Sequence, residues 1–181
     1  MLTTPASPVR RISWMWIFVN SRGRILVLGV GNELYGDDGV GPLAVATLEA
    51  ENTHKEVVLM DGGTRGLDLL YTLQEFDRAI VIDAVTDGGE GGRLLDFDLE
   101  EVDLRGYGPQ ISLHDLDLSS VIQLARTLGE ELPPIRVLGL TPVKTEPGPG
   151  LSPECEKMMP ELLARVREHL ARNVEIEPST C

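Results

Sequence analysis

The sequence predicts an α/β fold in which helices cover both faces of a mixed β-sheet. Short runs rich in Val, Ile and Leu alternate with segments of helical periodicity, a pattern typical of a parallel sheet. One link in this alternation, residues 85–92, has only about eight residues and is rich in glycine. A parallel crossover needs about a dozen residues or more, so the strand after this link is expected to run antiparallel.

The elements are expected in a definite order along the chain. Residues 24–30 form an apolar run without polar alternation, which predicts a first strand buried on both faces. Glycine, proline and capping residues mark the ends of the later segments. The expected order is helix 38–50, strand 56–61, helix 67–76, strand 78–84, antiparallel strand 93–99 joined by a hairpin, loop 100–113, a helix from 117 or 119 to 129, strand 135–142 and helix 153–173.

The chain of 181 residues is long enough for one domain, which we place at residues 24–173. Residues 1–23 contain a short apolar stretch with no small-residue cleavage site after it. A disordered extension or an upstream start codon is therefore favoured over a targeting signal, and the presence of this segment in the native protein stays open. Residues 174–181 are expected to form a frayed tail.

Charge and composition limit the partners that this protein can have. Its net charge of −13 disfavours nucleic acid and anionic membranes and favours cationic partners such as metal ions. No apolar run reaches the ~18 residues of a membrane span. The two cysteines, Cys155 and Cys181, form no CxxC pair, so we expect a soluble cytoplasmic protein. The sequence has no heptad pattern, and a monomer is expected.

Acidic residues follow three of the predicted strands. Asp38, Asp61 and Asp83 fall at or just past the carboxyl ends of strands, where open α/β sheets bind their ligands. Carboxylates gathered there repel one another unless a cation or a shared proton relieves the charge. For Asp38 and Asp83 a functional site is favoured. Asp61 is as well explained by a turn or a helix cap, and Asp37 is expected to cap the next helix.

The glycine-rich stretch at residues 27–41, "VLGVGNELYGDDGVG", raises the alternative of a nucleotide site. The dinucleotide fingerprint GxGxxG lacks its third glycine here, and no GK[ST] motif occurs in the chain. The acidic residues of the stretch would also repel a pyrophosphate. We expect the glycines instead to let the backbone turn sharply and bring Asp38 over the edge of the sheet.

One of the three histidines is a candidate metal ligand. His54 and His169 lie in polar surroundings and are expected to be solvated. His114 precedes a predicted helix, and it is equally well explained as a ligand or as a helix-start residue. Neutral imidazole with two carboxylates suits Zn, Ni or Fe. Cys155 has no histidine close in sequence, so a nucleophilic role is not favoured.

Five sequence blocks occur in the order and spacing of a known family. Over about residues 24–171 the chain resembles the nickel–iron hydrogenase maturation endopeptidases, in the blocks "ILVLGVGNELYGDDGVGPLAVATLE", "VVLMDGGTRGLDLL", "AIVIDAV", "ISLHDLDLSSVIQLA" and "VLGLTPVKTEPGPGLSPE". The resemblance implies a three-layer α/β/α sandwich of phosphorylase/hydrolase-like type. Its sheet would have five strands, one of them antiparallel.

The resemblance also implies an activity and a site. These enzymes remove a C-terminal peptide from the hydrogenase large-subunit precursor after nickel insertion. Asp38, Asp83 and His114 match the family's metal-contacting positions, although many relatives carry glutamate at the first. Asp38 and Asp83 are the candidate catalytic residues, and the possible supporting residues are Asp61, Gly31 and Asn32.

The metal and the catalytic class stay open at this point. Nickel is expected to be presented by the precursor, and another divalent metal could occupy the same site in the isolated protein. Nickel could serve as a recognition signal, a metal could activate water, or the two aspartates could share a proton. Two other functions are weighed against the peptidase: a non-catalytic nickel-sensing chaperone or binding module for the same precursor, and a nucleotide-dependent oxidoreductase.

Overall fold

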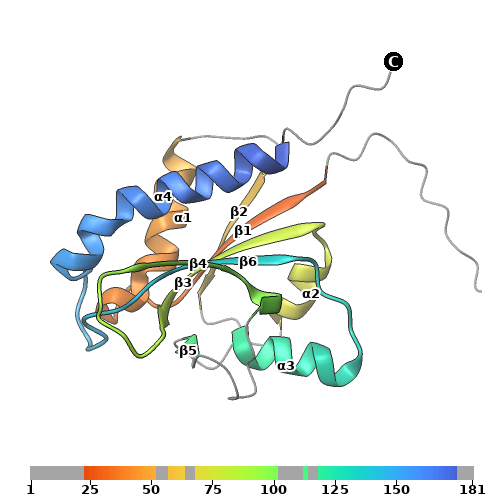
Figure 1. The fold of residues 1–181 in the computed structure, drawn as a ribbon, viewed down its shortest axis with the longest axis horizontal. Coiled ribbons are helices and arrows are strands. Elements are labelled where there is room, and N and C mark those ends of the chain that lie inside the picture. The colour runs from red at the N-terminus through yellow and green to blue at the C-terminus, as the bar shows by residue number, and fades with distance from the viewer. Residues whose placement is uncertain (1–22, 52–56, 64–67, 102–111, 114–117, 175–181) are drawn as a thin grey trace, which may run out of the picture.

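The computed structural model of the chain describes residues 23–51, 57–63, 68–101, 112–113 and 118–174. Within these ranges the chain forms three layers, with a twisted sheet between two pairs of helices (Figure 1). The elements are β1 (Ile25–Val30), η1 (Gly36–Gly39), α1 (Val40–Glu51), β2 (Val57–Gly63), α2 (Asp68–Gln74), β3 (Arg78–Thr86), β4 (Leu94–Asp98), η2 (Leu99–Glu101), β5 (Ser112–Leu113), α3 (Leu118–Leu128), β6 (Ile135–Leu140) and α4 (Pro153–Val174).

The main sheet has five strands in the order β2-β1-β3-β6-β4. The first four of these are parallel to one another, and β4 runs antiparallel to β6. The predicted mixed sheet with one antiparallel strand is therefore confirmed. The short β5 pairs antiparallel with the end of β3.

The predicted hairpin between β3 and β4 is wrong, because β6 lies between these two strands. Two strands that have one other strand between them lie only about 9.5 Å apart in a sheet. The link between β3 and β4 can easily span that distance. It leaves a gap that β6 fills later in the chain with parallel pairing to β3 and antiparallel pairing to β4.

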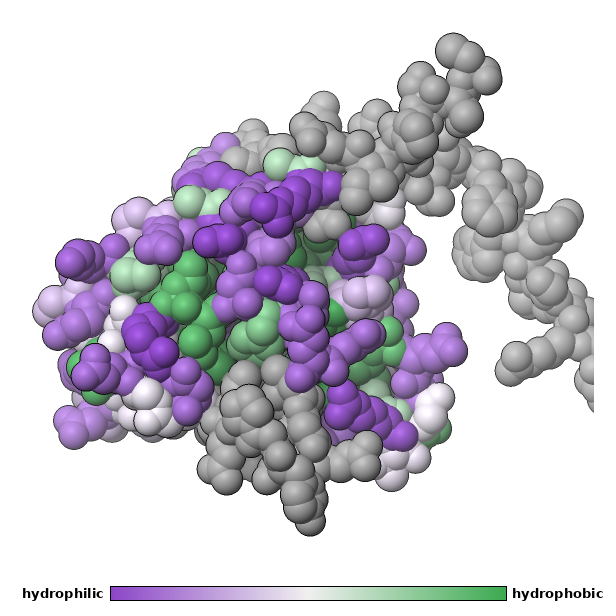
Figure 2. Space-filling view, in the orientation of Figure 1, coloured by the Kyte–Doolittle hydropathy of each residue, from purple (hydrophilic) through white to green (hydrophobic). Residues whose placement is uncertain are grey.

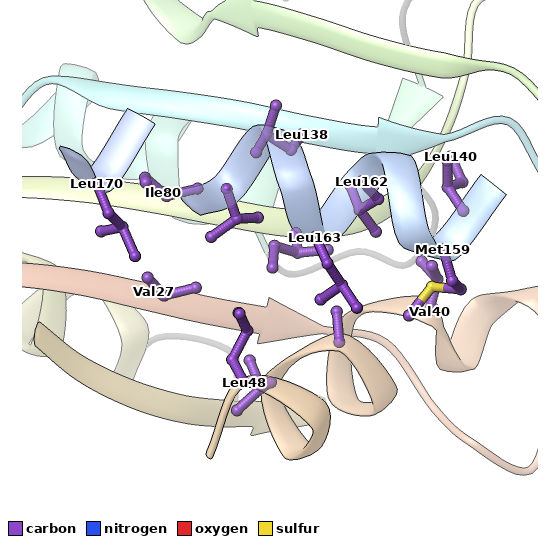
Figure 3. Close-up of a cluster of buried hydrophobic side chains, with 14 of the residues drawn as sticks. Val27, Val40, Leu48, Ile80, Leu138, Leu140, Met159, Leu162, Leu163 and Leu170 are labelled. Carbon is purple, nitrogen blue, oxygen red and sulfur yellow. The ribbon is translucent and has the colours of Figure 1, made fainter. Parts of the chain in front are cut away.

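Alternate residues of the strands pack against opposite helix layers. In β1, Ile25 and Val27 belong to the apolar cluster with α1 and α4, while Leu26 and Leu28 belong to the cluster with α2 and α3. Figure 3 shows the first cluster, in which leucines of α4 lie over the strands next to the buried face of α1. This burial explains why the strands carry no polar alternation.

The remaining expectations concern the ends of the chain and its surface. Of the predicted extension at residues 1–23 and the predicted tail at residues 174–181, residues 1–22 and 175–181 lie outside the described residues. The last helix ends at Val174, one residue into the predicted tail. None of the described helices is long and apolar enough to cross a membrane. Figure 2 shows a largely hydrophilic face with an apolar area around β4, at the edge of the sheet.

Candidate active site

The turn after β1 depends on a glycine. Gly31 has a φ of 123°, in the region that favours glycine, and a Cβ added there would lie 1.9 Å from the backbone oxygen of Asp38. The chain can therefore fold back on itself only because residue 31 has no side chain. This confirms the expected role of the glycine: the turn brings Asp38 back against the end of β1.

Two further glycines bring the start of α1 onto the sheet. A Cβ on Gly41 would lie 2.2 Å from the backbone oxygen of Val30 and 2.5 Å from that of Ile82. A Cβ on Gly29 would lie 2.3 Å from the backbone oxygen of Gly41. The first turn of α1 therefore touches both β1 and β3. As a result η1, which carries Asp38, contacts β3, which carries Asp83.

Asp38 is 5% exposed and is held by the turn that precedes it. Its Oδ2 accepts a hydrogen bond from the backbone N–H of Asn32 at 2.7 Å. The side-chain oxygen of Asn32 in turn accepts the backbone N–H of Leu34 at 3.0 Å. Asn32 thus orients the Asp38 carboxylate through its backbone and stiffens the turn through its side chain.

Asp83 is completely buried within β3. Its Oδ1 accepts a hydrogen bond from the backbone N–H of Ala84 at 2.7 Å. In the sheet, β1 pairs with β3 only as far as Ile82, whereas β6 continues beside it, with Gly139 opposite Asp83. Asp83 therefore lies just past the part of β3 that pairs with β1, on a strand that η1 contacts. The structure brings both predicted aspartates to contacting elements.

Asp37 does not cap the following helix, contrary to the expectation from sequence. Its buried carboxylate accepts backbone N–H groups of Val143 and Lys144 at 2.8 Å each. It also accepts the backbone N–H and the hydroxyl of Ser152, at 2.6 and 2.9 Å. Asp37 therefore ties η1 to the loop between β6 and α4. No local signal marks this role, because its partners lie more than a hundred residues away.

These hydrogen bonds determine the charge state of Asp37. Burial on its own would raise the pKa of the carboxyl. The hydrogen bonds from Ser152, Lys144 and Val143 together outweigh burial and hold the pKa of Asp37 below its usual range. The group is therefore a stable anion beside Asp38, engaged in structure.

Asp61 lies at the end of β2, where its Oδ1 accepts the backbone N–H of Gly63 at 2.8 Å. This is an Asx-turn, one of the two interpretations that the sequence allowed. Asp61 is exposed and lines an open hollow of about 320 Å³ with Gly31, Asn32, Glu33, Leu34, Pro42 and Gly63. The three possible supporting residues, Asp61, Gly31 and Asn32, therefore share one concave surface beside Asp38.

The third predicted metal ligand, His114, lies outside the described residues, as does His54. The neighbouring strand β5 is described, and its Leu113 pairs with Val85, two residues beyond Asp83. Within the described ranges no three His, Cys, Asp or Glu side chains are grouped so that they could hold a metal ion. The metal-binding role of Asp38, Asp83 and His114 therefore stays a prediction.

Two other residues can be assigned to structure. His169 is not solvated as expected: its Nε2 lies 3.1 Å from both carboxylate oxygens of Asp96. The thiol of Cys155 is free and buried at the start of α4. Burial raises the pKa of Cys155 to about 11, a value that leaves the thiol protonated near neutral pH. A nucleophilic cysteine is thereby disfavoured, as the sequence indicated.

The fold and the acidic pair can now be compared with known proteins. The family model HycI, described as hydrogenase maturation protease, matches residues 42–169. The chain belongs to this family. The hydrogenase expression/formation protein HupD of Bradyrhizobium diazoefficiens is 37% identical over 142 residues, covering 77% of this chain and 74% of that protein. The hydrogenase 2 maturation protease of Escherichia coli is 35% identical over 151 residues, covering 80% and 92%.

Solved structures of hydrogenase maturation proteases have the same fold. The hydrogenase maturating endopeptidase HybD of Escherichia coli aligns with a TM-score of 0.69 at 34% identity, over 82% of this chain and 93% of that one. The hydrogenase 2 maturation peptidase of a Thaumarchaeota archaeon aligns with a TM-score of 0.63 at 30% identity, over 82% and 98%. The three-layer fold inferred from the resemblance is confirmed.

Membership of the hydrogenase maturation proteases decides between the functions weighed from sequence. The chain is a peptidase that acts in hydrogenase maturation, as predicted, and neither a binding module nor a nucleotide-dependent oxidoreductase. Within this family, the two buried carboxylates on η1 and β3 are the natural candidates for the chemistry.

Proposed function

We propose that this protease removes a C-terminal peptide from the large-subunit precursor of a nickel–iron hydrogenase after nickel has been inserted. The observation that carries the proposal is the placement of Asp38 and Asp83. Both carboxylates are buried, and contacting elements hold them at the end of β1 where an open hollow begins. An open hollow beside buried acids suits a polypeptide substrate that must reach the reacting groups from outside.

Two carboxyl groups can supply the proton transfers that peptide hydrolysis requires. One carboxylate takes a proton from the attacking water, and the other carboxyl, in its protonated form, donates to the carbonyl oxygen or the leaving nitrogen. In this chain Asn32 orients Asp38 and Ala84 orients Asp83 through backbone N–H groups. Such fixed orientations are what a pair of acid and base needs before the substrate arrives.

Nickel enters this proposal as cargo of the precursor. We place its contacts at Asp38, Asp83 and His114, a set of two carboxylates and an imidazole that suits Ni²⁺. Another divalent metal could take the same donors in the isolated protein. Nickel bound to the precursor would then tell the protease that the precursor is ready for cleavage.

We also propose that the protease is a cytoplasmic monomer that acts on the precursor as its protein partner. The buried free thiol of Cys155 is consistent with a reducing compartment. Light scattering of the purified protein tests whether it is a monomer in solution. A monomer would present its hollow to the precursor without a second subunit.

The test of function is a cleavage assay with purified large-subunit precursor in nickel-loaded and nickel-free forms. Mass spectrometry would detect the released C-terminal peptide. We expect cleavage of the loaded form only, and a loss of at least 100-fold for Asp38→Asn and for Asp83→Asn. Asp98→Asn is the matched control, because this carboxylate is exposed at the far end of β4.

The outcomes separate the parts of the proposal. Equal cleavage of both precursor forms would exclude nickel as the signal but leave the peptidase role intact. Wild-type rates in both site variants would exclude Asp38 and Asp83 as the reacting groups. If the wild type cleaves the nickel-free precursor and a chelator stops that cleavage, the protease needs a metal of its own.

A further inference from the structure

Exposed apolar side chains are concentrated beside the candidate active site. Among the described residues, six large hydrophobic side chains are exposed, and four of them are Leu34, Tyr35, Leu43 and Val143. These four belong to the β1–α1 connection, the first turns of α1 and the loop after β6. Isolated exposed apolar residues need no explanation, but a group of them beside a site indicates a binding surface.

Backbone hydrogen bonds join these two loops into one surface. The N–H of Gly148 donates to the backbone oxygen of Leu34 at 2.8 Å, and the N–H of Gly36 donates to the oxygen of Gly148 at 2.9 Å. Tyr35 and Gly148 therefore form a parallel β-bridge between the loops. The Asp37 carboxylate also connects the same two loops, because it accepts the backbone N–H groups of Val143 and Lys144. The surface is therefore preformed and does not need the substrate to assemble it.

A groove of about 220 Å³ lies within this surface. This volume is smaller than that of a small-molecule site, which has about 300 Å³ or more, and it suits a single side chain. Apart from Glu33, its walls offer carbon atoms and glycine backbone, without the several convergent polar groups that a cofactor would need. The groove is lined by Glu33, Leu43, Pro149, Leu151, Gly36, Gly39 and Gly150.

Glu33 connects this groove to the hollow beside Asp38. The residue lines both spaces, with Leu43 on one side and Asn32 and Asp61 on the other. An extended polypeptide advances about 3.3–3.6 Å per residue. A segment that lies across the hollow would therefore place a side chain in the groove within a few residues of the reacting groups. The groove continues the substrate site and is not a separate patch.

We propose that this groove is a specificity subsite that binds one apolar side chain of the precursor, in an extended segment within about four residues of the scissile bond. The inference rests on the proposed function, because it assumes that the precursor polypeptide crosses the hollow. Burial of the apolar side chain against Leu43, Pro149 and Leu151 would favour the correct segment. An acidic side chain at the same position would be rejected, because the charged residue that lines the groove is Glu33, whose carboxylate repels it.

The test is a comparison of KM and kcat for cleavage of the full-length nickel-loaded precursor. We expect Leu43→Gln to raise KM at least 10-fold with kcat within twofold of the wild type. Leu43→Met, which has a similar shape without the polar amide, should keep KM within threefold. Leu128→Gln is the matched control, because it changes an even more exposed helical leucine, at the C-terminal end of α3, and should alter neither constant.

Precursor variants identify the residue that the groove binds. Each apolar residue within four positions of the cut is replaced by Asp in turn. The variant whose side chain occupies the groove should raise KM strongly with the wild-type protease and add little to the defect of Leu43→Gln. Purely additive effects at every position would overturn the subsite.

The remaining outcomes separate this inference from the proposed function. A wild-type KM for Leu43→Gln, with normal precursor cleavage, would overturn the subsite and leave the function standing. An equal rise in KM for Leu128→Gln would also overturn it, because the effect would then not belong to the groove. No cleavage by the wild type would overturn both. Thermal unfolding of each variant shows whether a change in KM follows from a loss of structure.

Discussion

Asp37 and Ser152 meet through two hydrogen bonds that join the first and last parts of the domain. The backbone N–H and the hydroxyl of Ser152 both donate to the Asp37 carboxylate, and the same hydroxyl oxygen accepts the N–H of Cys155 at 3.3 Å. Ser152 thus caps α4 and also holds the residue before Asp38. The start of α4 and the candidate catalytic turn are therefore one connected unit.

Replacement of Asp37 should destabilise the whole domain. Asp37→Ala removes one acceptor and leaves several buried donors without a partner, so we expect the free energy of unfolding to fall by about 3 kcal/mol. Ser152→Ala should cost about 1 kcal/mol through the lost cap. Urea unfolding of both single variants and the double variant measures this. Since the residues share a bond, the double variant should lose less than the sum, and strict additivity would contradict the connection.

Acid should weaken the contribution of Asp37. Its pKa is held below the usual range, so in the unfolded chain the carboxyl takes up a proton near pH 4, before the native state does. The unfolded state then binds more protons, and stability falls as the pH drops through this window. The difference in unfolding free energy between wild type and Asp37→Ala should be full above pH 5 and shrink below pH 4. A difference that stays constant down to pH 3 would contradict it.

The features of the site that could be predicted from the sequence are those that depend on neighbouring residues and on where the strands end. The positions of Asp38 and Asp83 follow from the rule that loops at the carboxyl ends of parallel strands meet at one edge of the sheet. The sharp turn at Gly31 is expected from the glycine-rich stretch in which it lies. The partners of Asp37 and His169 could not be found in this way. They are set by packing between segments that lie 73 to 115 residues apart, as in the pairs His169–Asp96 and Ser152–Asp37. The position of β6 between β3 and β4 depends likewise on a strand that comes later in the chain.

Gly31 should be essential for catalysis. In Gly31→Ala the new Cβ would collide with the backbone oxygen of Asp38, so the turn must move and the carboxylate with it. A displacement of about 1 Å can cost a factor of 100 in rate, and we expect precursor cleavage to fall at least that far. Gly129→Ala is the matched control. Gly129 also has a positive φ, of 69°, but has open space around its Cβ position.

The control variant Gly129→Ala should lose about 1 kcal/mol of unfolding free energy from backbone strain and should keep the wild-type cleavage rate. Similar cleavage by the two variants would show that the turn tolerates a side chain. Both positions have a positive φ, but only at Gly31 does the new Cβ also meet a backbone oxygen, with a φ outside the left-handed helical region.

Asp61 should contribute to precursor binding mainly through its negative charge, and less through the Asx-turn that it forms with Gly63. Asp61→Asn keeps an oxygen that can accept the Gly63 N–H, so the melting temperature should not change. The hollow beside Asp38 loses a negative charge, and we expect KM for the nickel-loaded precursor to rise about fivefold, the equivalent of ~1 kcal/mol. Asp61→Ala should show the same rise together with a lower melting temperature. An unchanged KM in both variants would restrict Asp61 to the Asx-turn.

Asp96 should contribute far more to stability than Asp98, although both lie on β4 and both bind Arg136. Asp96 is half-buried, and its carboxylate accepts from Arg136 at 2.6 Å and lies beside His169 of α4. Burial alone would raise the pKa of Asp96, but these partners hold it below its usual range. Asp98 contacts Arg136 at 3.0 Å with a side chain that is 55% exposed, where water screens the pair.

We expect Asp96→Asn to lower the free energy of unfolding by about 2 kcal/mol at pH 7, and Asp98→Asn by about 0.5 kcal/mol or less. Urea unfolding at low and high salt measures both. The loss in Asp96→Asn should persist in 1 M salt because the cluster is partly shielded from water, whereas the small loss in Asp98→Asn should vanish. Equal losses in the two variants would mean that Arg136 alone anchors β4, and that the contact between Asp96 and His169 does not fasten α4 to the edge of the sheet.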